Sequence, residues 1–406
     1  MKELKISDFD YQLPESSIAY YPLADRSQSK LLQYQAGKIS DHRFIELPDL
    51  VTSNDVLVFN NTKVVKARLI LQNANGARIE IFCLEPHEQS IEQAMQHQGE
   101  SVWKCLIGNA KRWKNQEILH LSFEAGGLDI ALQCERIGDV GSESLIHFSW
   151  NQPHISFSMI LDYLGKIPLP PYIKRDADAS DVNSYQTCYA QVEGSVAAPT
   201  AGLHFTPELL HRLKENGVEQ IELTLHVGAG TFKPVKTEGV NAHEMHAEQY
   251  AISQKAIERL IDAFKLGKRV IAVGTTSCRT LESLYWLGLK ALNGKLIRQE
   301  DCYTYQWEPY DIPKHHAGVA EAFTALLNFM NVQQTTRLEG KTGIMLMPGY
   351  SYRVIQGLIT NFHQPKSTLM LLVAAFVGKD WEKIYNHALS NQYRFLSYGD
   401  GSLLIP

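Results

Sequence analysis

Hydrophobic and polar positions change their period along the chain, and the changes divide it into segments of different type. Residues 55–60 form a short apolar run that is rich in β-formers and bounded by polar residues, which predicts a buried strand. From about residue 63 to 150, segments of alternating polarity follow one another with polar or glycine-containing turns between them, at 77–82, 103–107, 128–133 and 144–148. Several short strands in succession predict an antiparallel sheet or a small barrel.

Beyond residue 152, helical periods alternate with strand-like runs. Helices are predicted at 157–164, 206–217, 253–267, from 275 onward, at 368–377 and at 381–389, and strands at 269–274, 344–347 and 354–359. The predicted fold class is α/β: a large α/β domain with a mixed sheet, formed by 1–62 and 152–406, and a smaller antiparallel β-barrel domain inserted at 63–151. Segment 290–316 has no clear period and is predicted to be an insertion.

Composition narrows the class of protein. The 406 residues are 44% hydrophobic and 20% charged, which is typical of a folded globular protein, and the net charge of −5 argues mildly against a nucleic-acid partner without excluding one. The longest apolar run, 369–377, is far shorter than the roughly 20 residues that cross a bilayer, so it predicts a buried helix. The charged N-terminus is not a secretory signal, and no cysteine pair has C-x-x-C spacing. We therefore expect a soluble cytoplasmic protein.

Polar residues gather in several short clusters. Most of these clusters lie directly after a predicted strand, where a loop or helix begins. In open α/β sheets that edge is where ligands bind. The candidate site residues are Asn60, Asn61, Lys63, Arg68, Thr200, His204, His226, Thr231, His243, Glu244, His246, Thr275, Thr276, Arg279, Asn361, His363, Tyr398 and Asp400.

Each cluster also has a structural interpretation. The glycines at 228–230 are followed by no helix, which favours a turn beside a site over a dinucleotide-binding loop. Residues 274–277 could hold an anion at a helix N-terminus or be an ordinary cap. Two imidazoles at 243–246 favour acid–base chemistry over metal binding, because no further ligand pair accompanies them. Asp400 could cap a loop, and Lys111-Arg-Trp-Lys114 suits RNA or a solvated edge.

Taken together, these clusters resemble the S-adenosylmethionine:tRNA ribosyltransferase-isomerase family of queuosine biosynthesis. The resemblance runs from DFDYQLP at 8–14 to YRFLSYGD at 393–400. Its most specific parts are VAAPTAGLHF at 196–205, TLHVGAGTF at 224–232, AVGTT at 272–276 and TNFH at 360–363. So many matches in the right order are hard to obtain by chance.

The resemblance implies a transferase that consumes S-adenosylmethionine as a substrate and needs no cofactor or metal. Its ribosyl carbons are transferred and isomerised onto 7-aminomethyl-7-deazaguanine in a tRNA with a GUN anticodon, giving epoxyqueuosine, adenine and methionine. We expect a monomer with no membrane contact. Proton transfer is expected from His204, His226, His243, Glu244 or His246, and a carboxylate contact from Arg279 with Thr275 and Thr276; the remaining candidates are expected to bind substrate.

Some positions depart from the family pattern. Lys63 and Lys66 stand where arginine and proline are common, Gly401-Ser402 stands where alanine and methionine are common, and 290–316 is longer than usual. Two alternatives follow from other classes: a catalytically silent tRNA-binding paralogue, and an enzyme that cleaves S-adenosylmethionine on a small molecule. The number of titratable residues in the motifs favours an enzyme over a binding protein.

Overall fold

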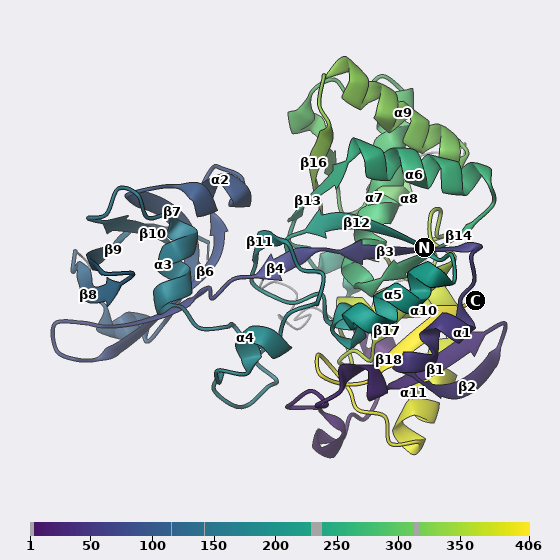
Figure 1. Cartoon of the computed structure of the whole chain (residues 1–406), viewed down its shortest axis with the longest axis horizontal. Helices are drawn as coiled ribbons and strands as arrows, with labels where there is room; N and C mark the ends of the chain where they lie inside the picture. Colours follow the sequence, from purple (N-terminus) through teal and green to yellow (C-terminus); the bar gives the residue numbers. More distant parts are fainter. Residues whose placement is uncertain (1–3, 115, 142, 229–237, 312–316) are drawn as a thin grey trace. The chain divides into compact units, whose positions relative to one another are not determined.

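The computed structural model describes residues 4–114, 116–141, 143–228, 238–311 and 317–406 (Figure 1). It contains two compact units. Unit 1 is formed by the chain up to Asn61, by Thr187–Ala190 and by Pro199–Pro406, and unit 2 by Thr62–Gln186 and Gln191–Ala198. No described helix is both long enough and apolar enough to cross a membrane. The α/β fold class with a smaller antiparallel domain is confirmed.

Unit 1 is built on a mixed sheet. Its strand order is β15-β16-β13-β12-β3-β14-β17-β18-β1-β2. The strands are β1 (Lys30–Gln35), β2 (Lys38–Arg43), β3 (Asp55–Asn60), β12 (Glu219–Leu225), β13 (Glu248–Ser253), β14 (Arg269–Val273), β15 (Tyr303–Thr304), β16 (Arg337–Thr342), β17 (Gly357–Asn361) and β18 (Gly401–Ile405). The central strands β12, β3, β14 and β17 are mutually parallel, so their carboxyl ends share one edge.

The central strands are buried on both faces, which is why β3 reads as a continuous apolar run. Leu57 and Phe59 point to one face, where helices α1 (Leu47–Leu50) and α5 (Pro207–Glu215) complete a core. Val56 and Val58 alternate with them, and α7 (Gly274–Leu292) contacts β3, β14 and β17. Helix α7 is itself covered by α9 (Val319–Val332), which packs against α6 (Gln254–Lys265).

Two helices begin after capping residues, Thr206 and Ser253, which are the first residues of their predicted ranges. Thr206 accepts a hydrogen bond from the backbone N–H of Leu209 at 3.2 Å, and Ser253 accepts one from Ala256 at 3.2 Å. Near the C-terminus, α10 (Thr368–Val377) and α11 (Trp381–Ser390) match their predicted ranges, and α10 is largely buried.

A buried carboxylate fixes the loop between β16 and β17. Glu282 of α7 accepts hydrogen bonds from the Tyr350 hydroxyl at 2.6 Å and from the backbone N–H groups of Arg353 at 2.9 Å, Val354 at 2.9 Å and Ile355 at 3.1 Å. Burial raises the pKa of this carboxyl group, and the hydrogen bonds oppose that rise. Glu282 is thus a structural anchor.

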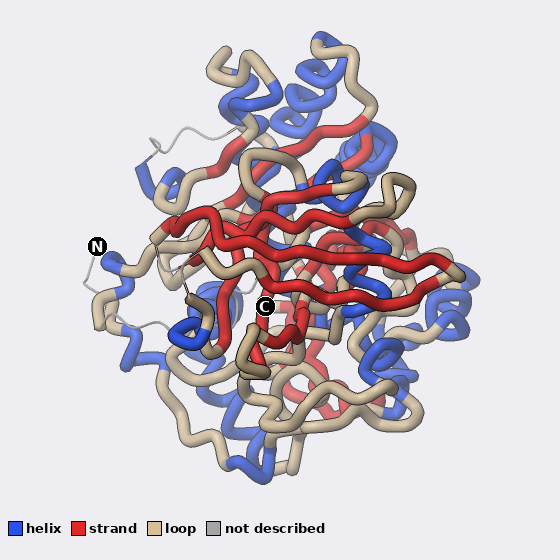
Figure 2. The backbone as a smooth tube through the Cα atoms, turned by 90° about the vertical axis from the view of Figure 1, so that its left-hand side faces the viewer, coloured by secondary structure: helices blue, strands red, loops and turns tan. Residues whose placement is uncertain are grey.

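Unit 2 is an antiparallel sheet with the order β5-β6-β7-β10-β9-β8. Its strands are β5 (Arg68–Gln72), β6 (Arg78–Pro86), β7 (Glu100–Gly108), β8 (Leu119–Ala125), β9 (Leu128–Val140) and β10 (Glu143–Trp150), and Figure 2 shows them in red. The terminal strands β5 and β8 also contact each other, so the sheet nearly closes. Unit 2 also contains helix α2 (Ile91–Gln96), helix α3 (Phe157–Leu164), helix α4 (Asp181–Ser184) and a parallel pair, β4 (Thr62–Val64) with β11 (Val192–Ser195).

Unit 2 extends beyond the predicted end of the insertion at residue 151. Helix α3 belongs to it, because Phe157 lies 5.1 Å from both Trp103 and Phe148 between ring centroids. The backbone of Lys166 also pairs with that of Arg68. Strand alternation shows where the barrel ends but not which helix packs against it.

Two further features, the loop at 344–347 and helix α9, differ from the sequence prediction. Residues 344–347 are buried but form no strand, so that assignment is wrong. Apolar content alone did not distinguish a buried loop from a strand there. Segment 290–316 includes the last residues of α7 and supplies β15, which joins the large sheet beside β16, so it is part of unit 1. Helix α9 was not predicted.

Candidate active site

The carboxyl edge of the central strands is held together by side-chain amides. Asn60, the last residue of β3, donates from Nδ2 to the carbonyl oxygen of Leu225 at 2.9 Å and to the Thr276 hydroxyl at 3.3 Å. Its Oδ1 accepts from the backbone N–H of Leu225 at 2.9 Å. One amide therefore joins the ends of β3 and β12 to the first turn of α7. Thr275, next to Thr276, is partly exposed.

Asn61 continues this arrangement. Thr224 donates its hydroxyl to Asn61 Oδ1 at 2.8 Å, and Asn61 Nδ2 donates to Glu222 Oε2 at 3.0 Å. His226, directly after β12, is buried, and its backbone N–H donates to the Gln249 carbonyl at 2.9 Å. Thr231 lies outside the described residues.

His204 lies in a closed hydrogen-bond network. Its Nδ1 is 2.8 Å from the Ser29 hydroxyl, which donates to the Arg26 carbonyl at 2.9 Å. Because Ser29 gives its proton to that carbonyl, Nδ1 of His204 carries the hydrogen and Nε2 accepts. Nε2 lies 3.3 Å from Asn361 Nδ2, and Asn361 Oδ1 accepts from the Thr200 hydroxyl at 2.8 Å. The network thus admits one consistent pattern of protons.

This environment keeps the imidazole of His204 neutral. Burial lowers the pKa of His204 to about 4, and the ring stacks on Phe44 with centroids 4.7 Å apart. Both ring nitrogens are occupied, so taking up a proton would break the contact with Asn361. The geometry favours a role for His204 in positioning Asn361 and Thr200.

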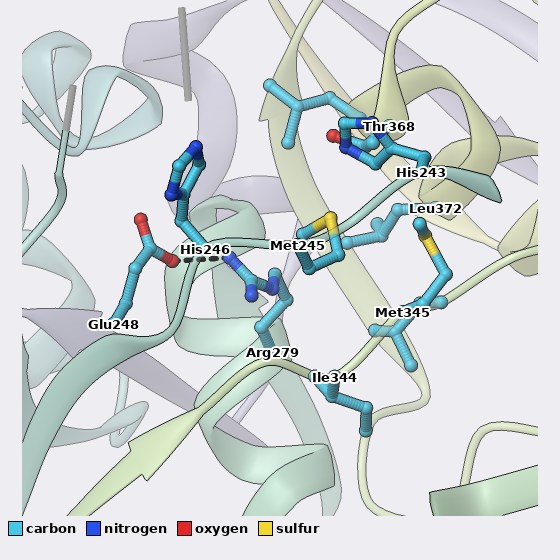
Figure 3. A pocket seen from close by; sticks show the side chains of 11 residues that line it. His243, Met245, His246, Glu248, Arg279, Ile344, Met345, Thr368 and Leu372 are labelled. Carbon is cyan, nitrogen blue, oxygen red and sulfur yellow. Dashed lines mark hydrogen bonds and ion pairs between the residues drawn. The ribbon is translucent and has the colours of Figure 1, made fainter. Parts of the chain in front are cut away.

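A separate pocket opens in unit 1 around Arg279 (Figure 3). Arg279 comes from α7, Glu248 from the start of β13, and Met245 and His246 from the segment before it. The pocket is lined by His243, Met245, His246, Glu248, Arg279, Ile344, Met345, Leu346, Thr368, Leu369 and Leu372.

The guanidinium of Arg279 is buried, with 8% of the residue exposed, yet only partly paired. Nη1 donates to Glu248 Oε2. Nε and Nη2 have no hydrogen-bond partner among the described residues. Those two nitrogens lie on the same edge of the guanidinium plane, the edge that holds a carboxylate through two parallel hydrogen bonds. Arg279 therefore has a buried carboxylate-binding edge whose two donors are unpaired among the described residues, here called its open edge, and the residue lines the pocket.

The two histidines beside Arg279 differ in burial. His243 is half-buried and His246 is exposed. Burial lowers the pKa of His243, and the nearby His246 adds to the effect. A neutral imidazole at physiological pH can accept a proton, so His243 is suited to general-base chemistry. Glu244 is exposed and does not line the pocket.

Gln306 fixes this histidine segment. Its Nε2 donates to the His243 carbonyl at 2.6 Å, and its Oε1 accepts from the Met245 N–H at 3.0 Å. Segment 290–316 therefore helps to build the site. Residues 312–316 of this segment lie outside the described residues.

The remaining candidates are paired elsewhere. In unit 2, Lys63 Nζ is 2.8 Å from Glu193 Oε1, and Arg68 Nε is 3.3 Å from Glu80 Oε1. In unit 1, His363 Nε2 lies 2.9 Å from the Thr360 hydroxyl, and burial lowers the pKa of His363 to about 4.

The C-terminal motif is also buried. Asp400 Oδ1 accepts from Arg394 Nη2 at 2.9 Å and from the backbone N–H of Lys30 at 3.1 Å, and Oδ2 accepts from the Arg394 N–H at 2.8 Å. Tyr398, two residues before Asp400, is also buried. Asp400 thus organises a loop, in agreement with its structural interpretation.

The basic tetrad at 111–114 does not present its aromatic ring. Trp113 is buried, and its Nε1 donates to the Glu117 carbonyl at 2.8 Å, so the indole cannot stack on a base. Lys111, Arg112 and Lys114 are exposed and remain available for phosphate contacts. Among the residues that the structure describes, no group of three or more His, Cys, Asp or Glu side chains is placed to hold a metal ion.

Comparison with known proteins places this chain in a family. The family model described as queuosine biosynthesis protein matches residues 6–404. The chain belongs to this family. It is 39% identical to the S-adenosylmethionine:tRNA ribosyltransferase-isomerase of Desulfitobacterium hafniense. The match covers 99% of this chain and the full length of that relative. The protein with the same name from Zymomonas mobilis is 38% identical, with 99% of this chain and all of the relative covered.

A solved structure is also similar. The S-adenosylmethionine tRNA ribosyltransferase of Thermotoga maritima is 26% identical, with 98% of this chain and all of that chain covered, at a TM-score of 0.47.

Two members of the site were not among the sequence candidates. Glu248 follows the His243–His246 segment as the first residue of a strand, and only its buried position opposite Arg279 distinguishes it. Gln306 lies in a segment without a period. The signal that could have found Glu248 is a charged residue at the start of an apolar strand, because a buried charge needs a partner.

Proposed function

We propose that this chain transfers and isomerises the ribosyl moiety of S-adenosylmethionine onto 7-aminomethyl-7-deazaguanine in tRNA, giving epoxyqueuosine with release of adenine and methionine. The observation that carries the proposal is the match over nearly the full chain to proteins named S-adenosylmethionine:tRNA ribosyltransferase-isomerase. A silent paralogue is less favoured, because binding alone does not require two imidazoles, His243 and His246, in the lining of the pocket.

The products define which bonds change. The bond between the sulfonium sulfur and ribose C5′ breaks, and its electron pair stays on sulfur to give methionine. The bond between ribose C1′ and adenine breaks, and the leaving base takes up a proton. A new carbon–nitrogen bond joins C1′ to the aminomethyl nitrogen, which gives up a proton. C5′ also gives up a proton, the bond between C1′ and the ring oxygen O4′ breaks, and new C1′–C5′ and C5′–O4′ bonds close the cyclopentane and its epoxide. Because the sulfonium acidifies the C5′ protons, one positioned base and one positioned acid are required.

The pocket around Arg279 supplies groups of the kinds that this chemistry needs. Arg279, with Thr275 and Thr276 at the start of the same helix, is proposed to receive the carboxylate of the substrate. His243 is proposed as the base, because it lines the pocket and burial favours its unprotonated form, and His246 as its exposed partner in proton transfer. His226 remains a candidate for the second proton transfer. Asn60, Asn361 and Thr200 are proposed to shape the sheet edge that faces the substrate.

The proposal extends to partners and conditions. The second substrate is a tRNA with a GUN anticodon that carries the deazaguanine base. The enzyme is proposed to act in the cytoplasm as a monomer, without a metal or a resident cofactor. The exposed cations Lys111, Arg112 and Lys114 are proposed to contact tRNA phosphates.

Incubation with S-adenosylmethionine and deazaguanine-modified tRNA, followed by nucleoside mass spectrometry, tests the function. The expected result is an epoxycyclopentane-bearing nucleoside, with one adenine released for each nucleoside formed. Tight tRNA binding without adenine release would instead support a silent paralogue. Adenine release that does not depend on tRNA would support an enzyme that acts on a small molecule.

A further inference from the structure

We infer that the Arg279 pocket recognises the complete zwitterion of an α-amino acid with an apolar side chain, with Glu248 receiving the ammonium group, and that it binds free L-methionine as an inhibitory product. The inference rests on the proposed function, which supplies a substrate with a methionine end. It adds a residue for the ammonium group and a form of regulation.

Arg279 Nε and Nη2 have no hydrogen-bond partner among the described residues, so one edge of the guanidinium is unfilled. A guanidinium offers five N–H donors, and a buried one that leaves donors unpaired loses their hydration without compensation. Another arginine of the same unit shows the filled arrangement: Arg269 Nε and Nη2 contact Asp55 Oδ1 at 2.6 Å and Oδ2 at 3.0 Å. The corresponding edge of Arg279 has no protein acceptor among the described residues. A carboxylate from a ligand would complete it.

Part of the pocket lining is apolar. Met245, Met345 and Leu372 lie around Arg279 in the same pocket, as Figure 3 shows. A phosphate of a nucleic-acid backbone is strongly hydrated and would gain nothing from thioether and leucine side chains. A carboxylate attached to an apolar chain would bury that chain against them. The lining therefore selects an amino-acid carboxylate over a phosphate.

Arg279 and Glu248 form a buried pair of opposite charges, with 8% and 6% of the residues exposed. Adding a simple anion would leave net negative charge in a poorly hydrated site, which is costly. A zwitterion adds no net charge, and its ammonium can share the Glu248 carboxylate, since a carboxylate accepts up to about four hydrogen bonds. His246 lies beside Glu248 in Figure 3, at the exposed side of this pair.

After ribosyl transfer, the released methionine retains the carboxylate, the ammonium and the apolar chain that the pocket recognises. Free L-methionine should therefore compete with S-adenosylmethionine for the free enzyme. Added tRNA should not overcome the inhibition of the enzyme by L-methionine.

The test is a calorimetric titration of the full chain with L-methionine, methionine methyl ester and 3-(methylthio)propionate, in the absence of tRNA. The ester lacks the carboxylate and the propionate lacks the ammonium group. We expect each to bind about tenfold or more weakly than L-methionine, because each loses a charge-assisted contact. Equal binding of all the compounds, or no binding of L-methionine at millimolar concentration, would overturn the inference.

Variants assign the two charges. Glu248→Gln should remove the preference for L-methionine over 3-(methylthio)propionate, and Arg279→Lys should remove most of the preference over the ester. The matched control is Arg269→Lys, which should leave both preferences unchanged because Asp55 fills its edge. Equal losses in the Arg269 and Arg279 variants would contradict a specific site. If a pocket variant fails to fold, the ligand series on the wild-type chain still decides.

The outcomes separate this inference from the proposed function. Ribosyl transfer to tRNA without methionine binding or competitive inhibition would refute the inference alone. Selective methionine binding by a chain that modifies no tRNA would refute the proposed function and leave an amino-acid pocket.

Discussion

The His204 network and the Arg279 pocket are both buried polar sites in unit 1, but they differ in how completely their groups are paired. Around His204, Ser29, Asn361 and Thr200 satisfy one another in a single consistent pattern. At Arg279, Nη1 is paired with Glu248, whereas Nε and Nη2 have no acceptor among the described residues. Both regions contain histidines, a residue type that often takes part in catalysis. Their pairing suggests that one is scaffold and the other is a place for a ligand.

The largest effect is expected from removing the open edge. Arg279→Met should lower kcat/KM for S-adenosylmethionine by about 1000-fold, because charge-assisted hydrogen bonds are lost and Glu248 is left buried without its partner. Steady-state kinetics at saturating tRNA measures the effect, with Arg269→Met as the comparison. A loss of less than about tenfold would show that the pocket does not hold the substrate.

The pocket histidines come next. His243→Ala and His246→Ala should fold and bind S-adenosylmethionine, yet lose roughly 100-fold in turnover, because each is proposed to move a proton. The control is His211→Ala, an exposed histidine on α5. Prolonged chelation should leave the wild-type rate unchanged. Activity lost on chelation and restored by zinc or manganese would contradict the metal-free view, and wild-type turnover in both variants would make these histidines structural.

Acid titration tests whether the paired His204 network keeps its imidazole neutral. Burial lowers the pKa of His204 to about 4, below its ordinary value near 6.5. The unfolded chain therefore takes up a proton that the folded chain refuses, and stability falls as pH drops from about 6.5 to about 4. From about pH 7 to about pH 5, His204 alone should account for about 2 kcal/mol of this loss.

Urea unfolding of the wild type and of His204→Asn at both pH values measures this contribution. The variant should be less stable at neutral pH but should lose less stability on acidification. His211→Asn should behave like the wild type. Identical pH slopes for His204→Asn and the wild type would show that His204 can be protonated in the folded state.

The smallest effect is expected in unit 2. Neutralising Lys111, Arg112 and Lys114 together should weaken tRNA binding by about tenfold at physiological salt and flatten its salt dependence, because fewer counterions are released. S-adenosylmethionine binding should not change. The control replaces the exposed lysines Lys214, Lys255 and Lys265 of unit 1. An unchanged salt slope would place the tRNA elsewhere, for example along Lys63, Lys66 and Lys174-Arg175.

The hydrophobic pattern predicted what depends on local periodicity. The β3 strand, the α3 helix and the caps of α5 and α6 follow from it because each is specified by its own residues. Residues 344–347 show the limit, since a buried loop held by tertiary contacts has the composition of a strand.

The sequence predicted which residues line the candidate site better than it predicted what each of them does there. Arg279, His243 and His246 were found because their motifs place them after strands or in a polar cluster. Whether a histidine is paired on both nitrogens, as His204 is, depends on Ser29 and Asn361, which are distant in sequence. The same holds for the open edge of Arg279, because only the assembled structure shows which donors remain unpaired.

The central claim is that the ribosyl part of S-adenosylmethionine, and neither its methyl group nor its methionine, is transferred to tRNA. The most direct measurement uses S-adenosylmethionine labelled with carbon-13 either in the ribose or in the methyl group, with mass spectrometry of the tRNA nucleosides and of the released methionine. We predict that all the ribose label appears in the modified nucleoside and all the methyl label remains in free methionine. Methyl label in the tRNA, or ribose label that never leaves an adenosine product, would contradict the account.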